Sequence, residues 1–259
     1  MTEDTTQKGL TAEQTADFHE NGYLKIGKLL EDDLVEVLRR EYNHEFEAAR
    51  KGGGFRNLAI DDTDDLEAKN NAPQQMLQIM QMCERNIHFR KLIFHAPLLD
   101  MVESLLGPNI QLFHDQALFK PAHTGGEIFW HQDNAYWQCT PPNLVSCWMT
   151  LDDVTVENGA MQLIPGSHRS PIVHNRAEHT GALLDSSGEA ESDRAVVIDL
   201  PAGGVMIHHC QAMHYTQPNN TDRQRRAFAI HYMTPGTRHL RKDGHLAVGF
   251  GRPMLRMKV

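Results

Sequence analysis

The sequence has few cysteines, and they do not form a motif. The 259 residues contain four, Cys83, Cys139, Cys147 and Cys210, with no Cys-x-x-Cys spacing. The first residues, Met1 to Asp4, are polar and acidic, unlike the basic and then apolar start of a signal peptide. We therefore expect a protein of the reducing cytoplasm.

Long apolar runs and an excess of basic residues are also missing. No apolar stretch approaches the roughly 18 residues needed to cross a bilayer, so we expect no membrane insertion. The formal net charge is -9 and the pI is about 5.9, whereas nucleic-acid binding relies on clustered Lys and Arg. The densest basic cluster is only Arg223, Arg225 and Arg226. A general nucleic-acid binder is therefore excluded.

The composition does allow one large hydrophobic core. Hydrophobic residues make up 40% of the chain, which is ordinary for a single β-rich domain of this length. We expect one domain, with a helical N-terminal part at about 1–109, a strand-rich core at about 110–235 and a tail at 236–259.

The N-terminal part carries helix signals. Thr11-Ala12-Glu13-Gln14 has the form of a capping box, and Asn21-Gly22 is typical of the end of the helix that follows. A short strand is predicted over Tyr23 to Ile26. Apolar residues at helical spacing predict an amphipathic helix over about 32–50. Further helices are expected at about 73–83, 84–94 and 97–106.

From Ile110 onward the pattern changes to short strand-like runs separated by Gly, Pro and Asn. The expected strands cover residues 111–120, 127–133, 145–151, 161–164, 196–200, 205–209 and 226–233. Strands after a helical part indicate an α+β fold. Composition alone leaves open whether the strands form a jelly roll or another β architecture.

One short segment holds two candidate metal ligands. In Trp130-His131-Gln132-Asp133, His131 and Asp133 are two residues apart and project from the same face of an extended strand. Such pairs also occur by chance, and His131 could instead be a hydrogen-bonded core histidine. With His214, far downstream, they would supply two imidazoles and one carboxylate. That ligand set leaves one side of a non-haem iron open.

The order of these motifs resembles the phytanoyl-CoA dioxygenase family of iron- and 2-oxoglutarate-dependent oxygenases. The resemblance is strongest at residues 130–133, at Asn158 to Arg169 and at Gly203 to Arg226. One departure is Gly204, where many relatives carry an aspartate, and we expect it to change a turn only. The resemblance implies a double-stranded β-helix (jelly roll) with N-terminal flanking helices. It also implies Fe(II) as cofactor, with 2-oxoglutarate and O2 as cosubstrates.

The resemblance also selects among the 16 histidines. It places the metal histidine just ahead of Pro218-Asn219, which points to His214. His209 matches a position that packs or hydrogen-bonds near the metal, and it is the alternative ligand if His214 lies far from His131. His208 and His231 are expected to be structural.

Several residues are candidates for holding 2-oxoglutarate. Arg225 shares a strand face with small residues, Ala227 and Ala229, so we assign it to the distal carboxylate, which a guanidinium binds with two hydrogen bonds. Arg226 faces the other way. By resemblance, the further candidates are Gln116, Lys120, Trp148 and Thr216. For Lys120 the alternative is a surface salt bridge, and for Trp148 it is core packing.

The expected activity is hydroxylation of an unactivated C–H bond of a small molecule, with release of succinate and CO2 and no catalytic residue beyond the metal ligands. Asp133 favours hydroxylation over halogenation, because related halogenases replace this carboxylate with a small residue. No basic patch for coenzyme A is evident, so a small metabolite is favoured over an acyl-CoA. Desaturation, epoxidation and ring closure would use the same ligands and stay open. Two alternatives outside this chemistry also remain: a non-oxidative cupin-like metal enzyme, and a catalytically silent jelly roll that binds a small molecule.

Overall fold

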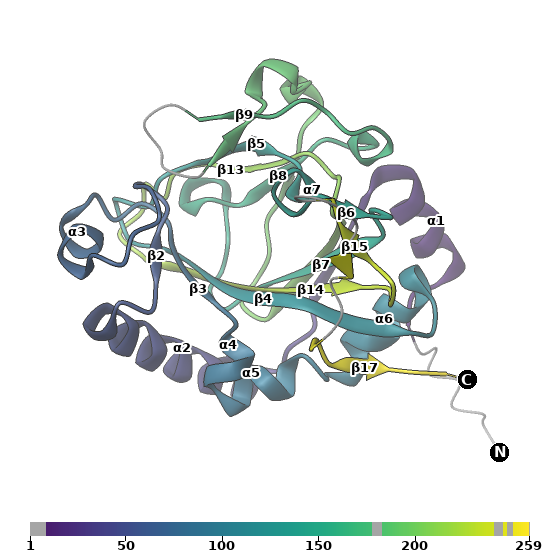
Figure 1. Ribbon diagram of the computed structural model, residues 1–259, viewed down its shortest axis with the longest axis horizontal. Coiled ribbons are helices and arrows are strands. Elements are labelled where there is room, and N and C mark those ends of the chain that lie inside the picture. The colour runs from purple at the N-terminus through teal and green to yellow at the C-terminus, as the bar shows by residue number, and fades with distance from the viewer. Residues whose placement is uncertain (1–8, 178–182, 241–245, 248–250, 259) are drawn as a thin grey trace.

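Two facing antiparallel sheets form the centre of the computed structural model, which describes residues 9–177, 183–240, 246–247 and 251–258 (Figure 1). The larger sheet holds, in spatial order, β1 (Tyr23–Lys28), β12 (Gly204–His209), β7 (Leu144–Thr150), β14 (Arg225–Met233), β4 (Ile110–Lys120), β3 (Leu77–Met80) and β2 (Arg56–Asn57), with β17 (Met254–Arg256) also paired to β4. The smaller sheet holds β11 (Val196–Ile198), β8 (Met161–Leu163), β13 (His214–Thr216) and β5 (Ile128–His131). The predicted α+β jelly roll is confirmed.

Two minor sheets lie beside this pair. One holds β16 (Leu246–Ala247), β15 (Arg238–His239) and β6 (Cys139–Thr140), and the other holds β10 (Leu184–Asp185) and β9 (Asn175–Arg176). The helices are α1 (Ala12–Asn21), α2 (Asp32–Gly52), α3 (Leu66–Asn71), α4 (Met82–Arg85), α5 (Ile87–Leu92), α6 (Ala96–Leu106) and α7 (Asp133–Trp137). Among the described residues, no helix is both long enough and apolar enough to cross a membrane.

The first helix begins and ends where the sequence predicts. The Thr11 hydroxyl accepts a hydrogen bond from the Gln14 backbone, and the Gln14 side chain accepts one from the Thr11 backbone, which completes the capping box. Gly22 ends α1 with a φ of 82°, a left-handed conformation that glycine adopts without strain. The chain then enters β1 directly.

Helix α2 covers the outer face of the larger sheet, as Figure 1 shows along the lower side of the molecule. It begins at the predicted residue and extends two residues further than expected, to Gly52. Its buried side chains follow helical spacing, and Phe46 packs against Phe119 of β4 with ring centroids 5.3 Å apart. On the same face, Phe89 of α5 packs against Phe228 of β14 at 4.8 Å. This aromatic layer anchors the helices to the sheet.

One predicted helix is wrong. Residues 73–83 form strand β3 and the start of α4. Leu77 and Ile79 are fully buried in the core under the helices, whereas Met76, Gln78 and Met80 line a cavity on the other face of the sheet. Alternation of this kind is a strand pattern, but methionine and glutamine favour helices, so local propensity was misleading. Strands from the first 109 residues therefore join the larger sheet.

Each of the later strands predicted from the sequence is present to within two residues at either end, but the expected strands did not include β13, which carries His214, or the short strands β6, β9, β10, β15, β16 and β17. The expected strand 127–133 stops at His131, and Asp133 begins α7. Gln132 keeps extended backbone angles of φ -108° and ψ 129°. The side chains of His131 and Asp133 therefore still point to one side, as they would on a continuous strand.

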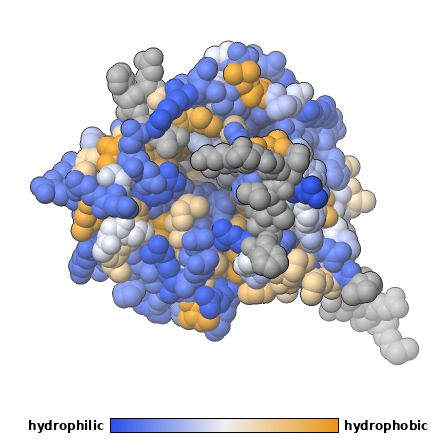
Figure 2. Space-filling model, in the orientation of Figure 1, coloured by the Kyte–Doolittle hydropathy of each residue, from blue (hydrophilic) through white to orange (hydrophobic). Residues whose placement is uncertain are grey.

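The surface is mostly hydrophilic. Figure 2 shows apolar side chains only in small groups on the face it presents. The exposed large apolar residues among those described are scattered along the chain, from Ile87 to Met257. Isolated apolar side chains of this kind are normal for a folded protein.

Candidate metal centre

The smaller sheet and the start of α7 bring three candidate metal ligands together. Strand β13 pairs with β5 so that His214 is the register partner of His131, and their ring centroids are 4.1 Å apart. The Asp133 Oδ1 atom lies 3.6 Å from His131 Nε2 and 3.7 Å from His214 Nε2. Two atoms that each lie about 2.1 Å from one ion can be at most about 4.2 Å apart. Both Asp133 distances are within this limit, and the ligand atoms of all three side chains lie within 4.8 Å of one another, so the geometry is close to that of a site for one ion.

This cluster stands out in the part of the chain that the structure describes. Among those residues, His131, Asp133 and His214 are the one group of three or more potential ligands whose donor atoms all lie within 4.8 Å of one another. Two imidazoles and one carboxylate on one side of an ion leave its remaining coordination positions open. The alternative ligand His209 is not needed, because His214 is adjacent to His131.

Backbone hydrogen bonds set the tautomer of both imidazoles. His131 Nδ1 is 2.7 Å from the Phe129 carbonyl, and His214 Nδ1 is 3.0 Å from the Ala212 carbonyl. A carbonyl only accepts, so each Nδ1 carries the hydrogen and each Nε2 has a free lone pair. Burial also lowers the pKa of His214 well below its usual value. Both rings are thus prepared to bind a cation through Nε2.

The two oxygens of Asp133 have different surroundings. Oδ2 is 3.2 Å from His208 Nε2 and 3.4 Å from the Ser146 hydroxyl, whereas Oδ1 faces the two candidate imidazoles. Burial alone would raise the pKa of this carboxyl, but His214, His131 and His208 outweigh burial and hold it well below its usual value. Asp133 is therefore an oriented carboxylate with one oxygen left for a metal.

This arrangement corrects the expectation for two histidines. His208, expected to be structural, is the one that contacts the Asp133 carboxylate, and it stands opposite Ser146 in the sheet. His209 points to the other side of β12, where its ring lies 5.4 Å from that of His168. The prediction that His209 supports the metal ligands is wrong, and His208 takes that place.

A cavity of about 520 Å³ lies between the two sheets and contains the triad. Arg225, Thr216, Trp148 and Gln116, all proposed from the sequence as cofactor contacts, also line it. The cavity is within the usual size range of small-molecule sites, about 300–1,000 Å³. The structure thus places the triad and four of the five expected cofactor residues around one space.

Arg225 is the most unusual residue in this cavity. It is 1% exposed, yet none of its three guanidinium nitrogens has a hydrogen-bond partner among the described residues. The guanidinium lies over Trp148, 5.7 Å from the ring centroid, and the Thr216 hydroxyl is likewise buried without a partner. Burial lowers the pKa of Arg225 to about 10, so the group remains charged at neutral pH. A buried, unpaired cation is costly and fits a carboxylate ligand.

Two other expected cofactor contacts have partners in the protein. Gln116 lines the cavity, but its amide is 3.0 Å from His231 Nε2 and also contacts Gln78. Lys120 is not among the cavity-lining residues, and its amine donates to the backbone carbonyls of Thr216 and Gln217. The geometry therefore does not support Lys120 as a 2-oxoglutarate contact. Its hydrogen bonds instead link the end of β13 to β4.

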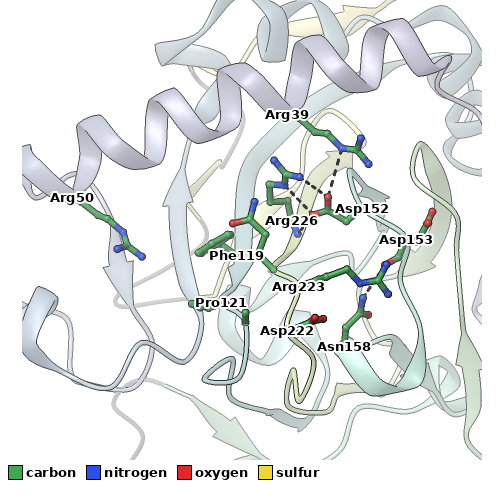
Figure 3. A pocket seen from close by; sticks show the side chains of 12 residues that line it. Arg39, Arg50, Phe119, Pro121, Asp152, Asp153, Asn158, Asp222, Arg223 and Arg226 are labelled. Carbon is green, nitrogen blue, oxygen red and sulfur yellow. Dashed lines mark hydrogen bonds and ion pairs between the residues drawn. The ribbon is translucent and has the colours of Figure 1, made fainter.

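Arg225 and its neighbour Arg226 lie on opposite faces of β14. Arg226 forms a bidentate ion pair with Asp152, with contacts of 2.9 Å and 2.6 Å. Figure 3 shows this pair, with Arg39 also directed at Asp152, in an outer cavity of about 580 Å³ beside α2. Arg226 is thus neutralised on the outside, as the strand alternation predicted.

Comparison with known proteins agrees with this site. The family model for phytanoyl-CoA dioxygenase (PhyH) matches residues 18–227. A probable alpha-ketoglutarate-dependent hypophosphite dioxygenase of Stutzerimonas stutzeri is 26% identical over 231 residues, which cover 85% of this chain and 78% of that protein. The rat peroxisomal phytanoyl-CoA dioxygenase is 24% identical over 249 residues, covering 91% of this chain and 72% of that protein.

A solved structure shares the fold. The apo form of the non-heme monooxygenase ThoJ superimposes with a TM-score of 0.73 at 24% identity, covering 95% of this chain and 84% of that one. At this identity the likeness supports the two-sheet architecture and its helices, while the site has to be argued from the residues of this chain.

Proposed function

Because this chain belongs to the phytanoyl-CoA dioxygenase family of Fe(II)- and 2-oxoglutarate-dependent oxygenases, we propose that it hydroxylates an unactivated C–H bond of a small molecule and converts 2-oxoglutarate to succinate and CO2. One observation carries the proposal. A metal-ligand triad and a buried, unpaired arginine line the same cavity.

The triad would hold the iron. His131 and His214 would bind through Nε2, and Asp133 through Oδ1, because the other polar atoms of these side chains already have partners. Iron, together with 2-oxoglutarate and O2, supplies the oxidising power when bound, which protein side chains lack. The chain's own task is to bind, to orient and to exclude water. We infer that the triad is sufficient for the chemistry and that no further catalytic residue is required.

Arg225 would hold the far carboxylate of 2-oxoglutarate. Its guanidinium can donate two parallel hydrogen bonds to one carboxylate, and the Thr216 hydroxyl can add a third. Ala227 and Ala229 lie on the same face of β14 and leave room for the ligand, while Trp148 covers the guanidinium. A dicarboxylate that reaches from Arg225 to the metal therefore satisfies buried groups that otherwise have no partner.

Asp133 supports oxygen transfer over halide transfer, because its carboxylate occupies the position that a halide would need. The rival functions leave observations without an explanation. A non-oxidative metal enzyme of the cupin type needs no 2-oxoglutarate and would give Arg225 no carboxylate to bind. A silent binding protein would leave the metal-ligand triad without a task. An oxygenase that uses 2-oxoglutarate therefore accounts for more of the cavity than either rival.

The test is turnover of 2-oxoglutarate. The protein is loaded with Fe(II), given 2-oxoglutarate and O2, and screened with small metabolites for compounds that increase release of succinate and CO2. We expect stimulated release with a hydroxylated product one oxygen atom heavier than the metabolite. A product without added oxygen would refute the hydroxylase assignment, and failure to consume 2-oxoglutarate would refute the oxygenase.

A further inference from the structure

A second arginine of the cavity, Arg56, lies away from the expected cofactor position. Strand β2 continues the larger sheet beyond β3, so that Arg56, Gln78, Leu118 and Ala227 form one row across four strands. Arg56, Gln78 and Leu118 all line the cavity. Ala227 in this row neighbours the Arg225 end of β14, so the row extends from the expected cofactor position to the edge of the sheet.

Arg56 has no strong partner in the part of the chain that the structure describes. Its Nη1 donates to the neutral Gln78 Oε1 at 3.1 Å, and its buried Nε has no hydrogen-bond partner. The nearest carboxylate is Asp62, whose Oδ2 lies 3.4 Å from Nε. The Asp62 side chain is 60% exposed, so water and salt screen this ion pair. The guanidinium therefore keeps both charge and donor capacity.

Arg56 is the one cationic side chain on the described lining of the cavity that has no part in holding the metal or 2-oxoglutarate. The ionised side chains among the described lining residues are Arg56, Arg225 and Asp133. The charge of a ferrous ion would equal that of the two carboxylates of 2-oxoglutarate, and the charge of Asp133 would balance that of Arg225. Arg56 is paired only with Asp62, an exposed carboxylate outside the described lining, so its charge is available to an anion that enters the cavity.

Tyr136 lies between this charge and the metal centre. Its ring makes an edge contact with that of His131 at 5.5 Å, and its hydroxyl accepts a hydrogen bond from the Leu184 backbone at 2.7 Å. Tyr136 also lines the cavity, so its ring forms part of the wall beside the metal centre.

Much of the cavity lining is apolar. Leu58, Met76, Met80 and Leu183 contribute side chains to it, alongside the polar Gln78 and Gln116. Methionine adapts to ligands of irregular shape, and apolar walls offer nothing to a second charged group. The cavity thus offers a substrate a mainly apolar lining together with the Arg56 guanidinium.

We propose that Arg56 binds an anionic end group of the substrate, a carboxylate or a phosphonate, and so directs an apolar carbon of that small acid toward the metal. This inference rests on the proposed function and names the substrate class of the same site. The guanidinium fork suits either group, because both offer two oxygens to parallel N–H donors.

The test uses matched probes on the intact protein. Anaerobic protein with Fe(II) and saturating 2-oxoglutarate, which fills the Arg225 end, is titrated with hexanoate, hexylphosphonate and the neutral hexanamide while the visible band of the ferrous complex is followed. We expect at least one anion to perturb the band with a Kd at least tenfold lower than that of hexanamide. The ratio between hexanoate and hexylphosphonate distinguishes the two acid groups.

Variants assign the preference to Arg56. Arg56→Gln is expected to abolish the tenfold preference, and Arg56→Lys to keep part of it, because the charge remains and the fork is lost. Asp62→Asn removes the exposed carboxylate that competes with a bound anion for Arg56, so it should tighten anion binding two- to threefold. Arg50→Gln, on the outer cavity beside α2, removes the same charge elsewhere and should leave the preference unchanged.

Several outcomes overturn the inference. These are equal binding of acid and amide, no binding of any probe, or an anion preference that survives Arg56→Gln. If Arg56→Gln fails to fold, an unchanged Kd in Asp62→Asn counts against the proposal. Failure of the proposed function looks different: the wild-type protein would then form no visible band with Fe(II) and 2-oxoglutarate, whatever the probe.

Discussion

His208 Nε2 lies 3.2 Å from Asp133 Oδ2, on the side of the carboxylate that faces away from the two candidate metal imidazoles. The Ser146 hydroxyl approaches the same oxygen at 3.4 Å and is itself 2.7 Å from His231 Nδ1. This network holds one oxygen and leaves the other for a cation. Groups that orient a ligand in this way contribute to metal affinity without touching the metal.

The first prediction concerns His208. His208→Ala should weaken Fe(II) binding by about 10- to 100-fold, because Asp133 loses its fixed orientation. Anaerobic Fe(II) titration under equilibrium dialysis measures the Kd. His209→Ala is the matched control, since this neighbouring ring points to the opposite side of β12, and its Kd should equal that of the wild type. A weakened Fe(II) Kd in His209→Ala with an unchanged Kd in His208→Ala would show that His209, and not His208, orients the metal ligands.

The second prediction separates the adjacent arginines. Arg225→Ala should raise the KM for 2-oxoglutarate by at least about 100-fold, since each of two hydrogen bonds to a charged group is worth about 1.5–3 kcal/mol. Arg226→Gln should leave that KM within about twofold but lower the free energy of unfolding, because Asp152 loses its bidentate partner. Initial rates of succinate formation, together with urea unfolding, measure both. Equal KM effects would refute the assignment of Arg225.

The third prediction concerns Lys120 and Thr216. Lys120→Met should destabilise the fold by about 1–3 kcal/mol, since two carbonyls of the β13 end lose their donor, while the KM for 2-oxoglutarate changes less than threefold. Thr216→Val should instead raise that KM about fivefold, as expected for one lost hydrogen bond of about 1 kcal/mol. A large KM effect in Lys120→Met would return the lysine to the cofactor site.

The fourth prediction is a pH dependence of stability. Burial lowers the pKa of His231 to about 4 and that of His209 to about 4, from an ordinary value of 6.5 in the unfolded chain. The unfolded chain therefore binds more protons between pH 6.5 and about 4, and the free energy of unfolding falls as pH falls through this window. Each unit of depression is worth about 1.4 kcal/mol.

Urea unfolding of the metal-free protein at pH 7 and pH 5 checks this dependence. His209→Gln should lose part of it, because the glutamine does not titrate. A wild-type protein that is equally stable at both pH values would show that these imidazoles are not held neutral by the fold.

Much of the fold follows from local signals in the sequence. The capping box at Thr11 and the glycine at Gly22 mark the ends of α1, and the spacing of Leu38, Tyr42 and Phe46 predicts α2. The segment at residues 73–83 could not be predicted in this way. Its strand exists because it pairs with β4, and that long-range contact overrides the helix preference of its methionines and glutamines.

The candidate site, like the fold, could be predicted only in part from local sequence signals. Trp130 to Asp133 contains two candidate ligands at a spacing that brings them to one face, and the resemblance points to His214. The choice between His208 and His209 depends on which face of β12 is turned inward. The turn at residues 210–213 separates β12 from β13, so strand alternation cannot be carried from His214 back to either histidine. Only the pairing of His208 with Ser146 across the sheet decides it.

Anaerobic titration of the purified protein with Fe(II) and 2-oxoglutarate shows directly whether the triad binds one ferrous ion. We predict a weak visible charge-transfer band that requires both components, saturates at one iron per chain, and is absent in His131→Ala and His214→Ala. A wild-type protein without the band, or a band that persists undiminished in either variant, would contradict the claim that these side chains bind one ferrous ion.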